Sequence, residues 1–192
     1  MDFFRKILGS FLLVEGISII VIWGMLIFSG ELQQAGQQLF SFVFHWLSEL
    51  LLAAFGIYTG INLLKNKHRV LRIAFFVLGL SVCSTYLASG YYLFKVPDYA
   101  MAGVIGFFFV LSLLFALLSF RYLKIQQPIR SFEYKFGLLG LGLAVYLLIN
   151  LCGEYGQNGE WLVFVLMLFL LLSACFFTYI FTFKRTVRIR SS

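Results

Sequence analysis

Residues 161–183 read WLVFVLMLFLLLSACFFTYIFTF, an unbroken apolar stretch without a charged side chain. At 1.5 Å of rise per helical residue, this stretch makes a helix of roughly 34 Å, which matches the hydrocarbon thickness of a bilayer. Apolar stretches of this length are typical of membrane-spanning helices. We therefore predict a spanning helix over about 161–183.

The composition of the chain extends this interpretation to all 192 residues. Hydrophobic residues make up 61% of the chain and charged residues only 12%, whereas soluble domains carry about 25% charged residues. So little charge cannot cover the surface of a water-soluble fold of this size. We expect an all-α, polytopic membrane protein, and the mean hydropathy of +0.95 agrees with this class.

Five further stretches are apolar and long enough to span a bilayer. The six predicted helices cover about 7–29, 40–64, 70–94, 100–123, 136–152 and 161–183. Their connections are short, so we expect one transmembrane domain over 1–192. Arg5 and Lys6 precede the first stretch as they would in a signal peptide, but Glu15 interrupts it and no A-x-A site follows, so we expect a retained helix.

The basic residues predict the orientation of this bundle. All but one of the 15 Lys and Arg residues fall on one predicted side: Arg5, Lys6, Lys65, Lys67, Arg69, Arg72, Arg121, Lys124, Arg130, Lys135, Lys184, Arg185, Arg188 and Arg190. By the positive-inside rule, both termini are cytoplasmic. The net charge of +7 therefore indicates topology and not a nucleic-acid partner. The residues of this set from Lys65 to Arg190 are candidate contacts for anionic headgroups of the inner leaflet or for a cytoplasmic protein.

A weak internal repeat divides the chain into three helical hairpins. The segment LGLSV at 78–82 recurs 63 residues later as LGLAV at 141–145, and EGISI at 15–19 lies 63 residues earlier. Chance similarity among apolar helices is the competing interpretation. Gly56 and Gly60 form a GxxxG motif, which lets helices approach closely. We expect this motif to pack within the bundle, with homo-oligomer formation as the alternative.

Two carboxylates, Glu15 and Glu49, fall inside predicted spans. A charged residue at the middle of a spanning helix costs about 2.5–3.5 kcal/mol on insertion scales, so such residues are functional candidates. His45 precedes Glu49 by one turn and shares its helix face. Along the bundle axis we expect the two carboxylates to be offset by roughly 9 Å, too far for a direct hydrogen bond.

Three interpretations of Glu15, His45 and Glu49 remain open at this point. The residues could be hydrogen-bonded groups that specify packing, or they could line a polar path for a proton, a cation or an amine-bearing ligand. A metal site is the third, but two carboxylates and one histidine without a recognisable second shell are thin evidence. We therefore predict no metal ion and no cofactor.

Catalytic motifs are missing from the sequence. It contains no H-E-x-x-H and no G-x-S-x-G. Ser89-Gly90 resembles the end of the G-x-S-G motif of rhomboid-type proteases, but no histidine follows on the later helices to activate the serine. Cys83, Cys152 and Cys175 form no C-x-x-C pair. We predict that the protein is not an enzyme and that its cysteines serve packing.

The stretch FGIYTGINLL at 55–64, together with six spans arranged as three hairpins, resembles the layout of HdeD-type bacterial inner-membrane proteins. The resemblance covers the whole chain and implies a bacterial inner membrane and a link to acid-stress resistance. It transfers no functional residue. We expect a small permeation or transport-type protein or an accessory subunit. The alternative is a membrane scaffold or sensor, for example in stress or defence, that recruits a cytoplasmic partner through its basic loops.

Overall fold

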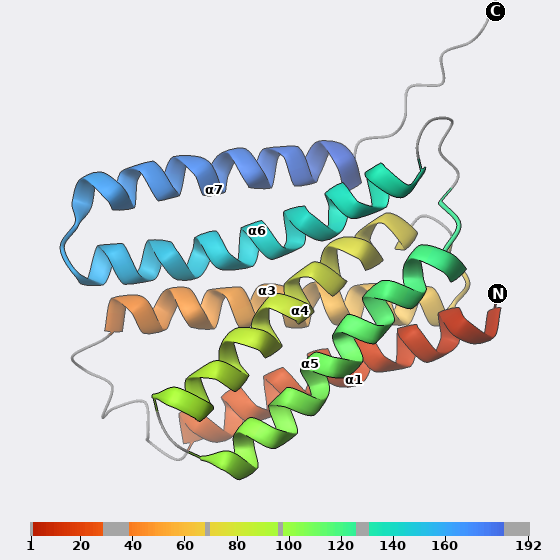
Figure 1. The fold of residues 1–192 in the computed structure, drawn as a ribbon, viewed down its shortest axis with the longest axis horizontal. Helices are drawn as coiled ribbons and strands as arrows, with labels where there is room; N and C mark the ends of the chain where they lie inside the picture. The colour runs from red at the N-terminus through yellow and green to blue at the C-terminus, as the bar shows by residue number, and fades with distance from the viewer. Residues whose placement is uncertain (1, 29–38, 68–69, 96–97, 126–130, 183–192) are drawn as a thin grey trace, which may run out of the picture.

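The computed structural model describes residues 2–28, 39–67, 70–95, 98–125 and 131–182. These residues form six helices: α1 (Asp2–Phe28), α3 (Leu39–Leu64), α4 (Leu71–Phe94), α5 (Tyr99–Tyr122), α6 (Ser131–Gln157) and α7 (Trp161–Thr182) (Figure 1). Each helix contains a segment long and apolar enough to cross a membrane. The described part of the chain contains no strand. The predicted all-α, multi-pass membrane fold is confirmed at this level.

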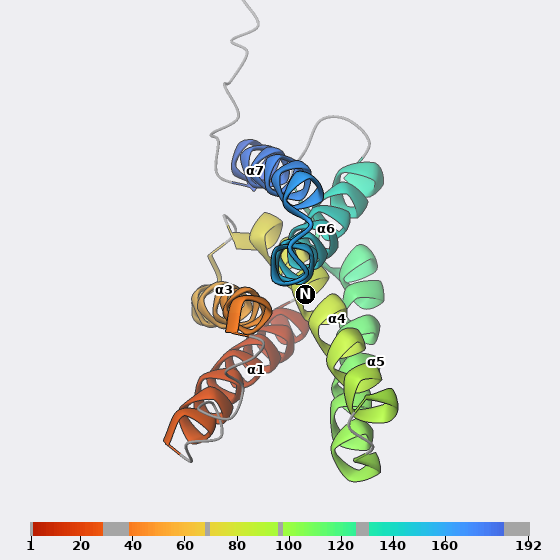
Figure 2. The same cartoon turned by 90° about the vertical axis from the view of Figure 1, so that its left-hand side faces the viewer.

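The helices form three pairs that meet in the middle of the bundle. α1 packs on α3, α5 packs on α4 and α7 packs on α6, while α3, α4 and α6 contact one another. Figure 2 shows the pairs extending in three directions from this centre. Two-thirds of the spanning segment of α4 (67%) is buried, against 11% for α5 and for α7. α4 is therefore the central helix, and the exposed apolar faces of α5 and α7 suit a lipid environment.

The helix at the predicted fifth span is longer than the predicted range of 136–152. The helix observed there, α6, is one of the two longest in the fold. Its first turns are polar enough to fall outside a hydropathy window, yet they remain helical and packed. Lys135 in these turns is buried and donates from Nζ to the carbonyl oxygen of Phe120 at 3.0 Å.

The other end of α6 is extended for a similar reason. Gln157, its last residue, accepts hydrogen bonds through Oε1 from the backbone N–H groups of Phe40 (3.2 Å) and Ser41 (3.4 Å). The first N–H groups of a helix have no partner within the helix. The side chain of Gln157 therefore caps α3 from a neighbouring helix, which a hydropathy window cannot detect.

Glycines bring α1 and α3 together. A Cβ atom on Gly60 would lie 2.7 Å from the carbonyl oxygen of Gly9, and one on Gly56 would lie 3.1 Å from that of Leu12. Both glycines of the GxxxG motif therefore face α1. The expected packing of this motif within the bundle is confirmed.

A second glycine contact joins α4 and α6. A Cβ atom on Gly79 would lie 2.1 Å from the carbonyl oxygen of Leu139, and one on Gly142 would lie 2.1 Å from that of Phe76. Gly79 and Gly142 belong to the two LGL segments of the predicted repeat, which thus lie against each other. The corresponding segment of α1 packs on α3 instead, through Gly16. The repeat itself stays a prediction.

Candidate functional site: a buried polar network

Both intramembrane glutamates point into the bundle. Glu15 lies halfway along α1 and is 6% exposed, and Glu49 on α3 is 8% exposed. On α1, Glu15 continues the buried face of Leu8 and Leu12, because residues three and four apart share one side of a helix. The helix that packs this apolar face inward therefore also carries the carboxyl group inward.

Glu15 is linked to α4 and α5 through two serine hydroxyls. Its Oε1 is hydrogen-bonded to Ser81 Oγ at 2.5 Å, and Ser81 Oγ is hydrogen-bonded to Ser112 Oγ at 2.8 Å. Ser112 also donates to the carbonyl oxygen of Phe108 at 2.8 Å. The second carboxyl oxygen of Glu15, Oε2, is buried and has no hydrogen-bond partner among the residues described.

Glu49 is held differently, by two donors on the same oxygen. Ser84 on α4 donates from Oγ to Glu49 Oε1 at 2.6 Å, and the hydroxyl of Tyr146 on α6 donates to the same atom. Tyr146 is completely buried, so its hydroxyl needs a partner inside the fold. The carboxyl group of Glu49 thus connects α3, α4 and α6.

One face of α4 serves both carboxyl groups. Ser81 and Ser84 are three residues apart and therefore lie about one turn apart on the same side of the helix. Each carboxyl group binds a different serine, as expected for a pair too distant for a direct hydrogen bond.

His45 shares a helix face with Glu49 but is bonded elsewhere. Its Nδ1 lies 3.0 Å from Asn150 Oδ1 on α6, and because an amide oxygen only accepts, Nδ1 carries the hydrogen. Asn150 also donates from Nδ2 to Ser48 Oγ at 3.1 Å. His45 is half-buried, with its ring centroid 6.1 Å from that of Trp23. These contacts extend the polar groups toward the end where α3 begins and α6 ends.

The two acids stand out in the sequence, whereas most of their hydroxyl partners do not. Ser81 lies in a segment of the predicted repeat, and Ser84 and Ser112 belong to no motif of the sequence. A usable signal exists in retrospect, because each of these hydroxyls lies near the middle of an otherwise apolar helix. Such depth is costly for a polar group without a partner.

The partners of the two carboxyl groups are hydroxyl groups. Across the described ranges, no cluster of three His, Cys, Asp or Glu side chains has the arrangement of a metal site. Hydroxyl and carboxyl groups both donate and accept hydrogen bonds when they carry a hydrogen. The arrangement can therefore hold and pass protons.

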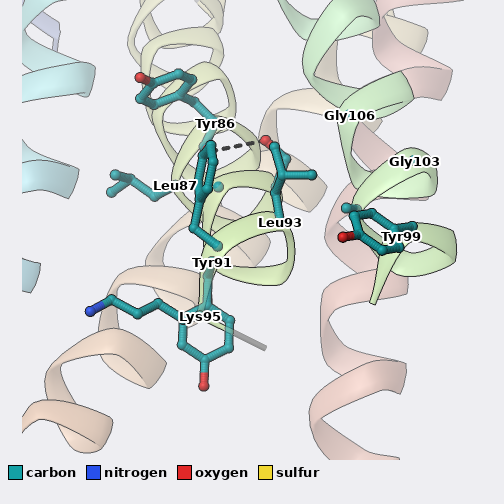
Figure 3. Close-up of a pocket in the computed structure, with 12 residues that line it drawn as sticks. Tyr86, Leu87, Tyr91, Leu93, Lys95, Tyr99, Gly103 and Gly106 are labelled. Carbon is teal, nitrogen blue, oxygen red and sulfur yellow. Dashed lines mark hydrogen bonds between the residues drawn. The ribbon is translucent and has the colours of Figure 1, made fainter. Parts of the chain in front are cut away.

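A groove of about 740 Å³ lies elsewhere, between the adjoining ends of α4 and α5. Figure 3 shows Tyr91 of α4 and Lys95, which follows that helix, on one side of it and Tyr99 of α5 on the other. Neither glutamate lines this groove. Glu15 and Glu49 instead contact packed polar side chains.

Apart from Lys135, the basic candidate residues fall into three groups. Those exposed at the end of the bundle where the N-terminus lies are Lys65, Lys67, Arg121 and Lys124. Arg72 is half-buried, with its guanidinium carbon 5.8 Å from the centroid of the Tyr134 ring. Those outside the described residues are Arg69, Arg130, Lys184, Arg185, Arg188 and Arg190.

Lys135 departs from the expectation of an exposed contact. Its side chain is only 6% exposed, and its Nζ lies 5.8 Å from the centroid of the Phe75 ring as well as near the Phe120 carbonyl. The carbonyl lies in the last turn of α5, where a cation complements the helix dipole. Lys135 is therefore a packing residue in this fold and not a surface contact.

The central part of the polar network lies in a region of the chain that matches a protein family. A family model described as "Domain of unknown function (DUF8058)" matches residues 2–130, which include Glu15, Glu49 and the serines that bind them. Tyr146 and Asn150 lie beyond the matched region. No curated protein and no solved structure matches the chain, and the resemblance to HdeD-type proteins stays a prediction. Because the match covers more than half of the chain, the protein belongs to this family of unknown function.

Proposed function

We propose that this protein is a small, non-enzymatic, transport-type membrane protein in which Glu15 and Glu49 form the central part of a path for a proton or small cation. One observation carries the proposal. Two carboxyl groups from different helices are bound by Ser81 and Ser84, one turn apart on the central helix α4. A displacement of α4 would therefore change the surroundings of both acids together.

The depth of the two acids supports a role beyond packing. Insertion of a charged residue at the centre of a spanning helix costs about 2.5–3.5 kcal/mol. Serine or glutamine would supply hydrogen bonds between helices at a lower cost.

The hydrogen-bonded groups around Glu49 continue toward one end of the bundle. From Glu49 they continue through Ser48 and Asn150 to the half-buried His45. Toward the opposite, basic end, the large buried apolar side chains of Leu8, Leu12, Phe75 and Leu138 lie among buried polar ones, which include Arg5, Thr59, Asn62, Ser119 and Lys135. We infer that the apolar side chains close this end in the conformation described here, and that transport requires the helices to separate there.

Flux measurements in liposomes test this proposal. Protein reconstituted with an internal pH-sensitive dye is expected to conduct protons, and Glu15→Gln and Glu49→Gln should each reduce the flux to that of empty liposomes. Glu154→Gln and Glu160→Gln are matched controls, because both residues are exposed near the end of α6, and they should leave the flux unchanged. Wild-type flux in both Glu15→Gln and Glu49→Gln would contradict the proposal.

We also propose that the basic end faces the cytoplasm of a bacterial cell, with both termini inside and the exposed lysines against anionic inner-leaflet headgroups. Lys65, Lys67 and Lys124 support this orientation by their exposure at that end. In a variant without the native cysteines, Asn158→Cys should react with an impermeant maleimide on intact cells and Asn66→Cys should not. The opposite labelling pattern would invert the topology.

A further inference from the structure

We infer that the carboxyl group of Glu15 carries a proton, which it donates to the serine chain that leads to α5. This inference deepens the proposed function by naming the transported species as a proton. In that respect it rests on the proposed function. The inference follows from counting the hydrogen atoms that the observed hydrogen bonds require.

Three hydrogen bonds connect Glu15 to the backbone of α5 in series. They join Glu15 Oε1 to Ser81 Oγ (2.5 Å), Ser81 Oγ to Ser112 Oγ (2.8 Å) and Ser112 Oγ to the carbonyl oxygen of Phe108 (2.8 Å). Each bond needs one hydrogen, and each serine hydroxyl has only one to give. The carbonyl oxygen has none. The third hydrogen must come from Glu15.

The direction of the chain follows from this count. Ser112 donates to the carbonyl of Phe108, so it accepts from Ser81, and Ser81 in turn accepts from the protonated carboxyl group of Glu15. With Glu15 ionised, Ser81 would have to donate to it, and one of the remaining two contacts would lack a hydrogen. The unpartnered Oε2 of Glu15 agrees with the protonated form, because a buried carboxylate with a single donor is poorly compensated.

The hydrogen bonds of Glu49 do not require a proton on its carboxyl group. Ser84 and Tyr146 have one hydroxyl hydrogen each, and both donate to Oε1 of Glu49. These two bonds are complete without a hydrogen from Glu49, unlike the chain that begins at Glu15.

The chemistry of the surroundings favours a proton over a metal cation as the ligand of Glu15. Divalent hard cations take six or more oxygen ligands. The oxygen of Ser81 is the one bonded to the Glu15 carboxyl group, and the next oxygen, that of Ser112, is reached only through Ser81. One hydrogen completes this arrangement.

Infrared difference spectroscopy on protein labelled with ¹³C-glutamate tests the assignment. At neutral pH, the wild type should show the C=O stretching band of a protonated carboxylic acid. Glu15→Gln should remove this band, whereas Glu49→Gln and the exposed control Glu154→Gln should keep it. A band that survives Glu15→Gln, or that disappears only in Glu49→Gln, would overturn the assignment.

A second variant keeps the test valid if Glu15→Gln does not fold. Ser112→Ala removes the middle of the donor chain, so Ser81 loses its acceptor and the Glu15 band should shift in frequency without disappearing. Ser173→Ala is the matched control, since Ser173 on α7 donates only to its own helix, at the carbonyl of Phe169, and it should leave the band in place. An unshifted band in Ser112→Ala would contradict the chain.

The spectroscopic and transport results separate the two proposals. Loss of the band in Glu15→Gln in a protein without proton flux would support the assignment and contradict the proposed function. Flux that depends on Glu15, in a protein whose band is insensitive to Glu15→Gln, would contradict the assignment and leave the proposed function supported.

Discussion

Gly79 of α4 and Gly142 of α6 face each other at the helix crossing. A Cβ atom built on either glycine would lie 3.0 Å from the Cα atom of the other. Ser81 follows Gly79 by two residues, and Tyr146 follows Gly142 by one turn. The close crossing therefore brings the serines of α4 and the tyrosine of α6 to the same depth, where both helices reach Glu49. Packing of two glycines positions the polar network.

Replacing either crossing glycine is expected to destabilise the bundle. In Gly79→Ala or Gly142→Ala, the added methyl group meets a backbone oxygen at 2.1 Å, which no rotamer change can relieve. Overpacking of this kind costs about 1–3 kcal/mol or more. The unfolding midpoint in detergent should fall for both variants, as measured by circular dichroism.

Two other glycines of α6 provide the control for this prediction. A Cβ atom on Gly137 or Gly140 would meet nothing within 4 Å. Alanine there should be neutral or stabilising by up to about 1 kcal/mol, because glycine is a poor helix former. Equal unfolding midpoints for Gly142→Ala and Gly140→Ala would contradict a close crossing.

Removal of the Tyr146 hydroxyl should weaken the fold through Glu49. Tyr146→Phe preserves the ring but leaves Ser84 as the remaining donor to a buried carboxyl group. Loss of one partner from a buried polar pair costs about 1–3 kcal/mol, which equilibrium unfolding should detect. Tyr86→Phe is the control, since Tyr86 is 61% exposed. Identical stability losses in the two variants would argue against the Glu49 contact.

Asn150 is expected to fix the hydrogen position on His45. In Asn150→Leu, the acceptor 3.0 Å from His45 Nδ1 is lost, so the proton is free to move between the ring nitrogens. The ¹⁵N chemical shifts of the His45 ring should change accordingly. Asn62 lies on α3, as His45 does, and Asn62→Leu breaks only a bond to the carbonyl of Tyr58. This variant should leave the shifts of the His45 ring unchanged. Unchanged shifts in Asn150→Leu would mean that Asn150 does not hold the ring.

Much of the fold was predictable from the sequence because membrane spans are recognised by length and apolar composition. All six helices were located in this way, and the GxxxG motif of Gly56 and Gly60 correctly indicated a close contact within the bundle. The ends of α6 were not predictable. Lys135 and Gln157 are polar, so hydropathy excludes them, yet each finds a partner on another helix.

The candidate site likewise contains residues that the sequence indicates and residues that it does not. Glu15 and Glu49 stand out in the sequence because a carboxyl group in an apolar helix is conspicuous at any rotation of that helix. Their partners do not, because serine and tyrosine are ordinary residues in such helices. His45 illustrates the difference, since its position one turn from Glu49 suggested a pair, whereas the neighbouring α6 supplies Asn150 instead.

The sequence by itself determined that six helices are long and apolar enough to span a membrane and that two of them carry an acid far from their ends, since both properties depend on residue types along a single helix. Only the tertiary structure decided that Ser81 binds Glu15 and that Ser84 and Tyr146 bind Glu49. These contacts depend on how each helix is rotated and how closely helices approach. Both are set by glycine contacts between helices that lie far apart in the chain, as at Gly79 and Gly142.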